Sequence, residues 1–169
     1  YENDRALDDF SLLYTGTGVL PEDFWQRYSD GLKSWTEKGR TYYKVARIDG
    51  DDWYPNQFVY LPGDDEAEFR VAKVGDAFVE LQIVDDYRSH QHAVWGITSR
   101  NREQNFAMNA LMDPEIDFVT LLGTAGTGKT LLALAAGLAQ TMDQQRYREI
   151  IMTRATVSVG EDIGFLPGT

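Results

Sequence analysis

The sequence predicts an α+β region that continues into an α/β region. We expect a small antiparallel β module, a barrel or a sandwich, followed by the first βαβ unit of a parallel sheet. Between residues 40 and 98, short apolar runs alternate with polar residues at a period of two, as in strands with one buried face. Beyond residue 99, runs at 118–122 and 149–153 have the composition of strands buried on both faces, and helix-forming residues separate them.

The first 39 residues predict a connector followed by an amphipathic helix. Residues 1–20 carry acidic side chains and glycines with little periodicity, which is typical of a linking segment. Pro21 is expected to begin the helix. The large apolar residues after it recur at three- and four-residue steps and form one aromatic face. They are Phe24, Tyr28, Leu32 and Trp35. We expect this face to pack against a neighbouring domain.

Residues 40–98 predict the β module. The runs with a period of two are separated by turn signals and lie at 41–47, 57–61, 68–73, 77–84 and 92–97. Asp49-Gly50 and Gly75-Asp76 are hairpin dipeptides. Short strands at this spacing favour a small barrel or sandwich. His90 and His92 lack further ligands at metal-binding spacing, so a zinc site is not expected.

Cations and aromatic residues are interleaved near the start of this module. The cations are Lys33, Lys38, Arg40, Lys44 and Arg47, with Glu37 opposing them, and the rings are Trp35, Tyr42 and Tyr43. Such a mixture can hold single-stranded nucleic acid. A solvated strand edge, lined with cations that block aggregation, explains the same residues more simply. Both interpretations stay open at this point.

Residues 99–169 predict the N-terminal, incomplete part of an α/β domain. Residues 100–112 form a helical run, and Asp113-Pro114 ends it because the residue before a proline avoids the helical conformation. The strand at 118–122, a helix beginning near 131–136 and the strand at 149–153 then follow. No third strand follows in the sequence.

Composition restricts the class of protein. With 43% hydrophobic and 25% charged residues, the chain has the composition of a soluble globular protein. No apolar run is long enough to span a bilayer, so no membrane partner is expected. The absence of cysteine fits a reducing compartment, and we expect a cytoplasmic location. A net charge of −11 argues against a general nucleic-acid coat. We interpret the chain as part of a longer protein.

Residues 123–130 form the most informative motif. They read Gly123, Thr124, Ala125, Gly126, Thr127, Gly128, Lys129 and Thr130, a complete G-x-x-x-x-G-K-[ST] phosphate-binding loop. Such a loop must leave a buried strand and open into a helix, and the runs on either side satisfy both conditions. The glycines permit positive φ angles and a close approach of the backbone to a ligand. The alternative is a glycine-rich turn that happens to precede a lysine.

The motif predicts binding of a nucleoside triphosphate with Mg²⁺. The N–H groups of the loop and of the first helical turn would form an anion cradle, which the helix dipole reinforces. Lys129 is expected to reach the β- and γ-phosphates and is the candidate catalytic residue. The Thr130 hydroxyl is expected to ligate Mg²⁺.

Three segments of the sequence resemble the PhoH-like P-loop ATPase family. They are Asn101-x-x-Gln104-x-x-Ala107, residues 122–133 around the loop, and the closing string Gly160-Glu161-Asp162-Ile163-Gly164-Phe165-Leu166-Pro167-Gly168. The closing string discriminates best, because unrelated NTPases share the loop. The resemblance is strong over residues 100–169 and weaker over the first hundred. It implies that residues 99–169 open a RecA-like P-loop NTPase domain that binds ATP.

The first hundred residues resemble the bridge of longer family members, which join an N-terminal PIN nuclease domain to the PhoH ATPase. This implies ATP hydrolysis coupled to RNA unwinding or cleavage in the intact protein, and it allows a homo-oligomeric ring. Gln104 is similar to the glutamine that superfamily 1 helicases place against adenine, whose edge an amide can read by donating and accepting at once. Arg154 takes the place of a motif that contacts RNA backbone, although Ala155 replaces the usual proline.

The sequence shows no acidic Walker B strand, sensor or arginine finger. The pair Glu161-Asp162 does not follow an apolar strand. Without an acid to position Mg²⁺ and water, we do not expect these 169 residues to hydrolyse ATP by themselves. Two other functions stay open. One is an RNA- or protein-binding β module with an idle P-loop, and the other is a metabolite kinase, although no acceptor-substrate motif is visible.

Overall fold

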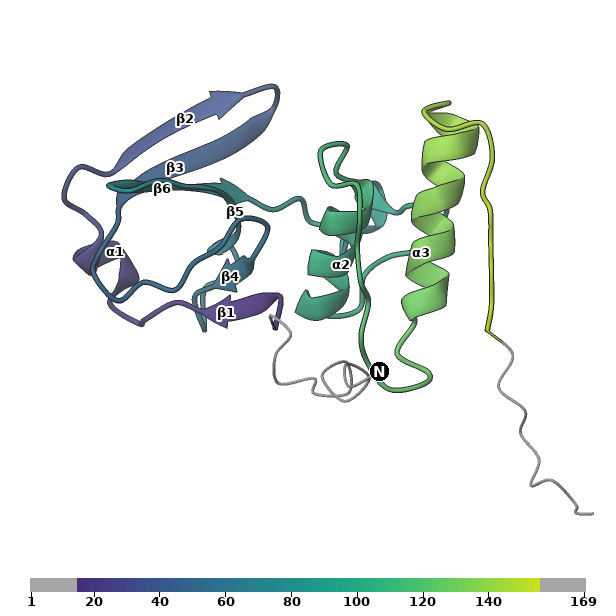
Figure 1. Ribbon diagram of the computed structural model, residues 1–169, viewed down its shortest axis with the longest axis horizontal. Helices are drawn as coiled ribbons and strands as arrows, with labels where there is room; N and C mark the ends of the chain where they lie inside the picture. The colour runs from purple at the N-terminus through teal and green to yellow at the C-terminus, as the bar shows by residue number, and fades with distance from the viewer. Residues whose placement is uncertain (1–14, 156–169) are drawn as a thin grey trace, which may run out of the picture.

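The computed structural model describes residues 15–155 of the 169. Figure 1 shows a curved β-sheet with the short helix α1 on one side and a helical part with α2 and α3 on the other. Predictions on residues 1–14 and 156–169, including Glu161-Asp162 and the closing string, lie outside the described residues. None of the helices in residues 15–155 is long and apolar enough to cross a membrane.

Six strands form one mixed sheet in the order β1-β4-β5-β6-β3-β2. Their bounds are β1 Thr17–Val19, β2 Lys33–Glu37, β3 Arg40–Ala46, β4 Phe58–Tyr60, β5 Glu68–Val74 and β6 Phe78–Ile83. All neighbouring strands are antiparallel except β1 and β4, which are parallel. The strands formed within residues 40–98 are thus antiparallel to one another, as predicted. The prediction of a connector over residues 1–20 is wrong at β1, which adds a parallel edge strand to the sheet.

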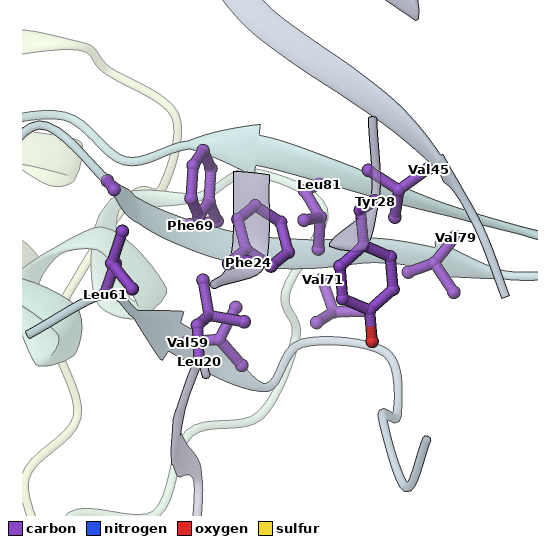
Figure 2. Packing of buried hydrophobic residues seen from close by; sticks show 11 residues of the cluster. Leu20, Phe24, Tyr28, Val45, Val59, Leu61, Phe69, Val71, Val79 and Leu81 are labelled. Atoms are coloured by element: carbon purple, nitrogen blue, oxygen red, sulfur yellow. The ribbon is translucent and has the colours of Figure 1, made fainter. Parts of the chain in front are cut away.

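One face of the sheet carries the main hydrophobic core. Alternate residues of the central strands are at most 1% exposed and point to this face: Val45, Phe69, Val71, Val79 and Leu81. Helix α1, Phe24–Arg27, lies across them, and the Phe24 and Phe69 ring centroids are 6.2 Å apart. Figure 2 shows the rings of Phe24 and Tyr28 among the aliphatic side chains of the strands. Burial of each such side chain stabilises the fold by roughly 1.5–3 kcal/mol.

Four of the five predicted strands are confirmed as β3, β4, β5 and β6. The fifth prediction, at 92–97, is wrong. His90–His92 forms a 3₁₀ turn, η2, and Val94 and Ile97 close a tight turn by exchanging two backbone hydrogen bonds of 2.9 Å. Within this turn Trp95 and Gly96 have φ angles of 49° and 72°, which are incompatible with an extended strand.

One of the two predicted hairpins is confirmed. Gly75-Asp76 lies in the turn that joins β5 to β6, and the Gly75 N–H donates to the Phe78 carbonyl at 2.8 Å. Asp49-Gly50 lies instead in the connection from β3 to β4, two strands that do not pair. A dipeptide that favours a hairpin can therefore also lie in a longer loop, when the two strands that it joins are not neighbours in the sheet.

The long helix predicted from Pro21 is wrong beyond its first turn. Helix α1 has four residues, and Gly31, at a φ angle of 68°, reverses the chain before β2. Trp35 then pairs with Tyr42 across β2 and β3, and their rings stack at 5.4 Å. Pairing in the sheet thus outweighs a spacing that also fits a helix.

The helical part contains α2, Arg102–Met112, and α3, Lys129–Leu138, which continues into a π-helical turn, η3, at Ala139–Asp143. The Asn101 side chain caps α2 by accepting from the Gln104 N–H at 2.8 Å. Asp113 ends α2 immediately before Pro114, as predicted. Apolar side chains of the two helices share a second core, which includes Met108, Leu132 and Ala136.

The two parallel strands predicted to flank α3 are not formed. Segments 118–122 and 149–153 have no strand partner among residues 15–155, although Figure 1 shows both as elongated traces. Phe118 is 86% exposed and Ile151 is 80% exposed. The prediction of a βαβ unit is therefore wrong for the described residues, because an apolar strand of this type needs neighbours that cover both of its faces.

Buried ionic contacts join α2 to the sheet. Glu68 of β5, 1% exposed, accepts from both terminal nitrogens of Arg88 at 3.0 Å and from Nε of Arg102 at 2.9 Å. At the other end of α2, Asp113 forms ion pairs with Arg40 and Arg70 at 3.3 and 3.4 Å. Both ends of the helix are thus fixed against the strands.

A ring stack lies between these two ionic contacts. The Phe58 ring of β4 stacks on Phe106 of α2 with their centroids 4.9 Å apart. Apolar packing and charge pairing therefore hold α2 in one orientation on the sheet, and α2 in turn carries Gln104 toward the glycine-rich loop.

Candidate functional site

The loop at residues 123–130 has the backbone geometry that its glycines predict. Gly123, Gly126 and Gly128 have φ angles of 158°, 80° and 86°. A Cβ at Gly123 would lie 3.3 Å from Thr127 Oγ1, and one at Gly128 would lie 3.2 Å from Gln104 Nε2. Positive φ angles thus favour glycine at all three positions, and close neighbours add to this preference at Gly123 and Gly128.

The loop leads directly into α3 and presents unpaired backbone donors. Within residues 15–155, the N–H groups of residues 128–131 donate to no protein acceptor, and the next group, the Leu132 N–H, donates to the Gly128 carbonyl at 3.0 Å. The first turn of a helix leaves such groups free and carries a positive partial charge. This part of the chain therefore has the donors that an anion needs.

Lys129 lies inside the loop. Its Nζ donates to the Gly123 carbonyl at 2.7 Å, to the Thr124 carbonyl at 2.6 Å and to Thr127 Oγ1 at 3.2 Å. Thr127 Oγ1 in turn donates to the Thr124 carbonyl at 2.9 Å. The ammonium group therefore stabilises the turn through uncharged acceptors, which phosphate oxygens can replace with stronger, charge-assisted hydrogen bonds.

Gln104 is brought to the loop from α2. Its Nε2 donates to the Thr127 carbonyl at 3.0 Å, and its Oε1 accepts from the Arg100 N–H at 2.8 Å. Both atoms of the amide therefore have a partner within the protein. Each atom keeps one further donor or acceptor position, which is available to a ligand.

A pocket of about 330 Å³ lies between the loop and the turn that precedes α2. Its lining residues are Gly96, Ile97, Thr98, Arg100, Gln104, Gly126, Thr127, Gly128, Leu131 and Leu132. None of them is acidic. Sequence reasoning missed the contribution of Gly96 to Arg100, because the run at 92–97 was interpreted as a strand. The Trp95-Gly96 dipeptide was the available signal for a turn.

Six of the predicted site residues do not line this pocket: Gly123, Thr124, Ala125, Lys129, Thr130 and Arg154. Thr130, the second residue of α3, is exposed and lies in the turn that carries the free N–H groups. Arg154 is exposed, and within residues 15–155 it forms no ion pair. The structure thus unites Gln104 with the loop and leaves Arg154 apart from the pocket.

Three glycines of positive φ, a lysine and a backbone that enters α3 thus lie together in this loop, as the sequence motif predicts. Residues 96–169 match the family described as PhoH-like protein. A comparison with solved structures finds no match.

Curated relatives agree with this family. The chain is 40% identical over 134 residues to Protein PhoH2 of Bacillus subtilis, and the matched region covers 77% of the chain and 29% of that relative. It is 47% identical over 77 residues to Protein PhoH2 of Thermobispora bispora, with 45% of the chain and 18% of the relative covered. It is 52% identical over 48 residues to the PhoH-like protein of Mycobacterium leprae, with 28% and 14% covered. The chain belongs to the PhoH-like family, and it spans less than a third of the length of these relatives.

Proposed function

We propose that residues 123–130 bind the phosphates of ATP, and that the intact protein hydrolyses ATP in a reaction coupled to RNA unwinding or cleavage. The observation that carries this proposal is the set of free N–H groups at residues 128–131, which open α3 behind glycines of positive φ. Such donors have no role within the described residues and fit a polyanionic ligand.

Each proposed ligand group has a protein counterpart. Lys129 exchanges its carbonyl acceptors for phosphate oxygens, and the Thr130 hydroxyl, one residue further along α3, ligates Mg²⁺. The bound cation would neutralise charge on the phosphates. Gln104, at the rim of the pocket, has a free donor and a free acceptor position for the base, which favours ATP among the nucleotides.

Hydrolysis requires a group that these residues do not supply. The pocket lining contains no carboxylate to position Mg²⁺ or the attacking water. We therefore propose that the 169-residue chain binds ATP with little turnover and that the intact protein provides the acid. RNA coupling and a ring assembly are proposals that rest on the family alone, and the proposal of a cytoplasmic location rests on the absence of cysteine.

The test is ATP binding by the 169-residue chain, measured as a thermal shift and by calorimetry with Mg²⁺. At one hundred times the dissociation constant, ATP should stabilise a competent site by about 2.7 kcal/mol. Lys129→Ala should abolish this shift, whereas Lys38→Ala, which removes an exposed lysine from the β2–β3 turn, should keep it. An unchanged melting temperature of the parent chain with saturating ATP would refute the proposal.

A further inference from the structure

The outer face of β2 and β3 carries rings and cations on the side opposite the hydrophobic core. Lys33 pairs with Lys44 and Trp35 pairs with Tyr42 in the register of the two strands. Because side chains alternate along a strand, these pairs face away from the side to which the core residue Val45 points. We define the basic-aromatic face as Lys33, Trp35, Tyr42, Lys44, Lys73 and Phe78.

The aromatic side chains on this face do not belong to any core cluster. Trp35 and Tyr42 stack at 5.4 Å with an interplanar angle of 11°. Phe78 is 45% exposed, and Lys44 Nζ lies 4.6 Å from its ring centroid. Strand β2 ends the sheet, and within residues 15–155 no ring other than Tyr42 contacts Trp35. Phe78 therefore keeps exposed ring surface on this face, whereas α2 packs on the same face of the sheet further along, over Phe58 and Arg70.

The cations on this face are unfavourable for the sheet by itself. Lys33 and Lys44 are directly opposite each other, and like charges in that position destabilise a strand pair. Glu80 is the one acid in the same row, between Lys44 and Lys73. Three cations thus share one carboxylate, in a chain whose net charge is −11. A bound polyanion would remove this repulsion.

Protection of the sheet edge does not explain the arrangement. Lysines that block aggregation belong on edge strands, and Lys33 on β2 fits that role. Lys44 lies on β3, where it is paired with Lys33 of β2 on one side and Glu80 of β6 on the other. Exposed rings beside the cations also do not contribute to the protection of a sheet edge.

We propose that the basic-aromatic face binds single-stranded RNA, with bases stacked on Trp35 and Phe78 and phosphates on Lys33, Lys44 and Lys73. The Trp35–Tyr42 row and the row of Ala46 and Phe78 are four residues apart along β3, which is roughly 13 Å. Lys44 lies between them, where the backbone that links two stacked bases would pass. The choice of RNA over DNA rests on the proposed function; the placement on this face does not.

The test is fluorescence anisotropy of a labelled single-stranded RNA of about 12 nucleotides with the 169-residue chain, without nucleotide and at several salt concentrations. Trp35→Ala should weaken binding roughly 5- to 150-fold, the range measured when a stacking residue is truncated. Lys44→Ala should lower the slope of log K against log salt by about 0.7, as expected for one phosphate contact to a single strand.

Arg47→Ala is the matched control, because it removes the same charge just beyond the end of the same strand, where the guanidinium donates to the Gly75 carbonyl outside the row of Lys33 and Lys44. It should leave the salt slope unchanged. Trp35→Phe retains a ring and should recover most of the affinity. Calorimetric ATP binding, measured on every variant, should not change, so failure of this inference is distinguishable from failure of the proposed function.

Several outcomes would overturn the inference. No RNA binding by the parent chain at low salt would do so, as would equal losses for Lys44→Ala and Arg47→Ala. Tighter binding of single-stranded DNA of the same sequence would reject RNA as the ligand. Self-association that Trp35→Ala abolishes, measured by sedimentation in the absence of RNA binding, would identify the face as a protein interface instead.

Discussion

Replacement of Glu68 by glutamine should destabilise the protein more than any other single conservative change in the sheet. The carboxylate is 1% exposed and accepts three hydrogen bonds of 2.9–3.0 Å from Arg88 and Arg102. Gln keeps the shape of the side chain, but it presents a donor amide to one guanidinium. It leaves Arg102 without a counter-charge, and Arg88 keeps only Asp86. The substitution thus removes the charge pairing and preserves the packing.

The expected loss of stability in Glu68→Gln depends on the solvent exposure of Arg88 and Arg102. Breaking a buried ion pair by removing one member costs about 3–5 kcal/mol. The side chains of Arg88 and Arg102 are 29% and 26% exposed, so water can partly solvate them, and the lower end, about 3 kcal/mol, applies. For a chain of this size that corresponds to a melting temperature about 6–12 °C lower.

Urea unfolding followed by tryptophan fluorescence measures this change. Glu68→Gln should lower the midpoint without altering the slope, whereas Glu66→Gln, an exposed neighbour, should change the stability by less than about 0.5 kcal/mol. Equal midpoints for the two variants would show that Glu68 does not hold α2 on the sheet, and the reasoning would fail.

Three further changes have defined outcomes. Gln104→Ala removes the hydrogen bond to the Thr127 carbonyl of the loop and the one from the Arg100 N–H, and it should weaken ATP binding about tenfold by calorimetry; an unchanged affinity would show that Gln104 does not support the loop. Tyr28→Phe removes the 2.7 Å hydrogen bond to Asp51 and should cost about 1.5 kcal/mol in urea unfolding, and no loss would mean that water replaces the bond. Hydrogen bonds from Arg88 lower the pKa of Asp86 below its ordinary value of 3.8, so its stabilisation is complete above that pH and is lost as the pH falls through the lowered pKa. Asp86→Asn should therefore reduce the loss of stability in acid by less than about 1 kcal/mol, because the group is half exposed, and an unchanged acid profile would contradict the assignment.

The sequence predicted the central strands because each has one buried face. Val79 and Leu81 alternate with Glu80 and Gln82, and this period of two identifies β6 without knowledge of its partners. Helix α2 was equally accessible, since Asn101 and Pro114 mark its two ends. Local chemistry decides these elements, so local patterns find them.

Elements that depend on distant partners were not predictable. Trp35 fits both a helical stripe and a strand, and its pairing with Tyr42 decides between them. Strand β1 exists through its parallel pairing with β4, about forty residues away, and three residues show no period. The segment at 118–122 has the composition of a buried strand, but composition does not supply the neighbours that would cover it.

In the candidate site, too, local sequence predicts some residues, and others depend on contacts with distant parts of the chain. The glycines and Lys129 were identified from their spacing, because the backbone conformation of the loop is encoded within eight residues. The opposite wall of the pocket, with Thr98 and Arg100, comes from a turn whose position depends on how α2 packs on the sheet. Only the resemblance to a family, through Gln104, pointed to that wall.

The first turn of α2 contacts both the sheet and the glycine-rich loop. Arg102 reaches the sheet at Glu68, and Gln104, half a helical turn further along, reaches the loop at Thr127. A ligand that shifts this turn from either side changes the free energy of binding on the other side, and thermodynamic linkage makes the two changes equal. ATP affinity measured with and without RNA, and RNA affinity measured with and without ATP, should therefore differ by the same factor.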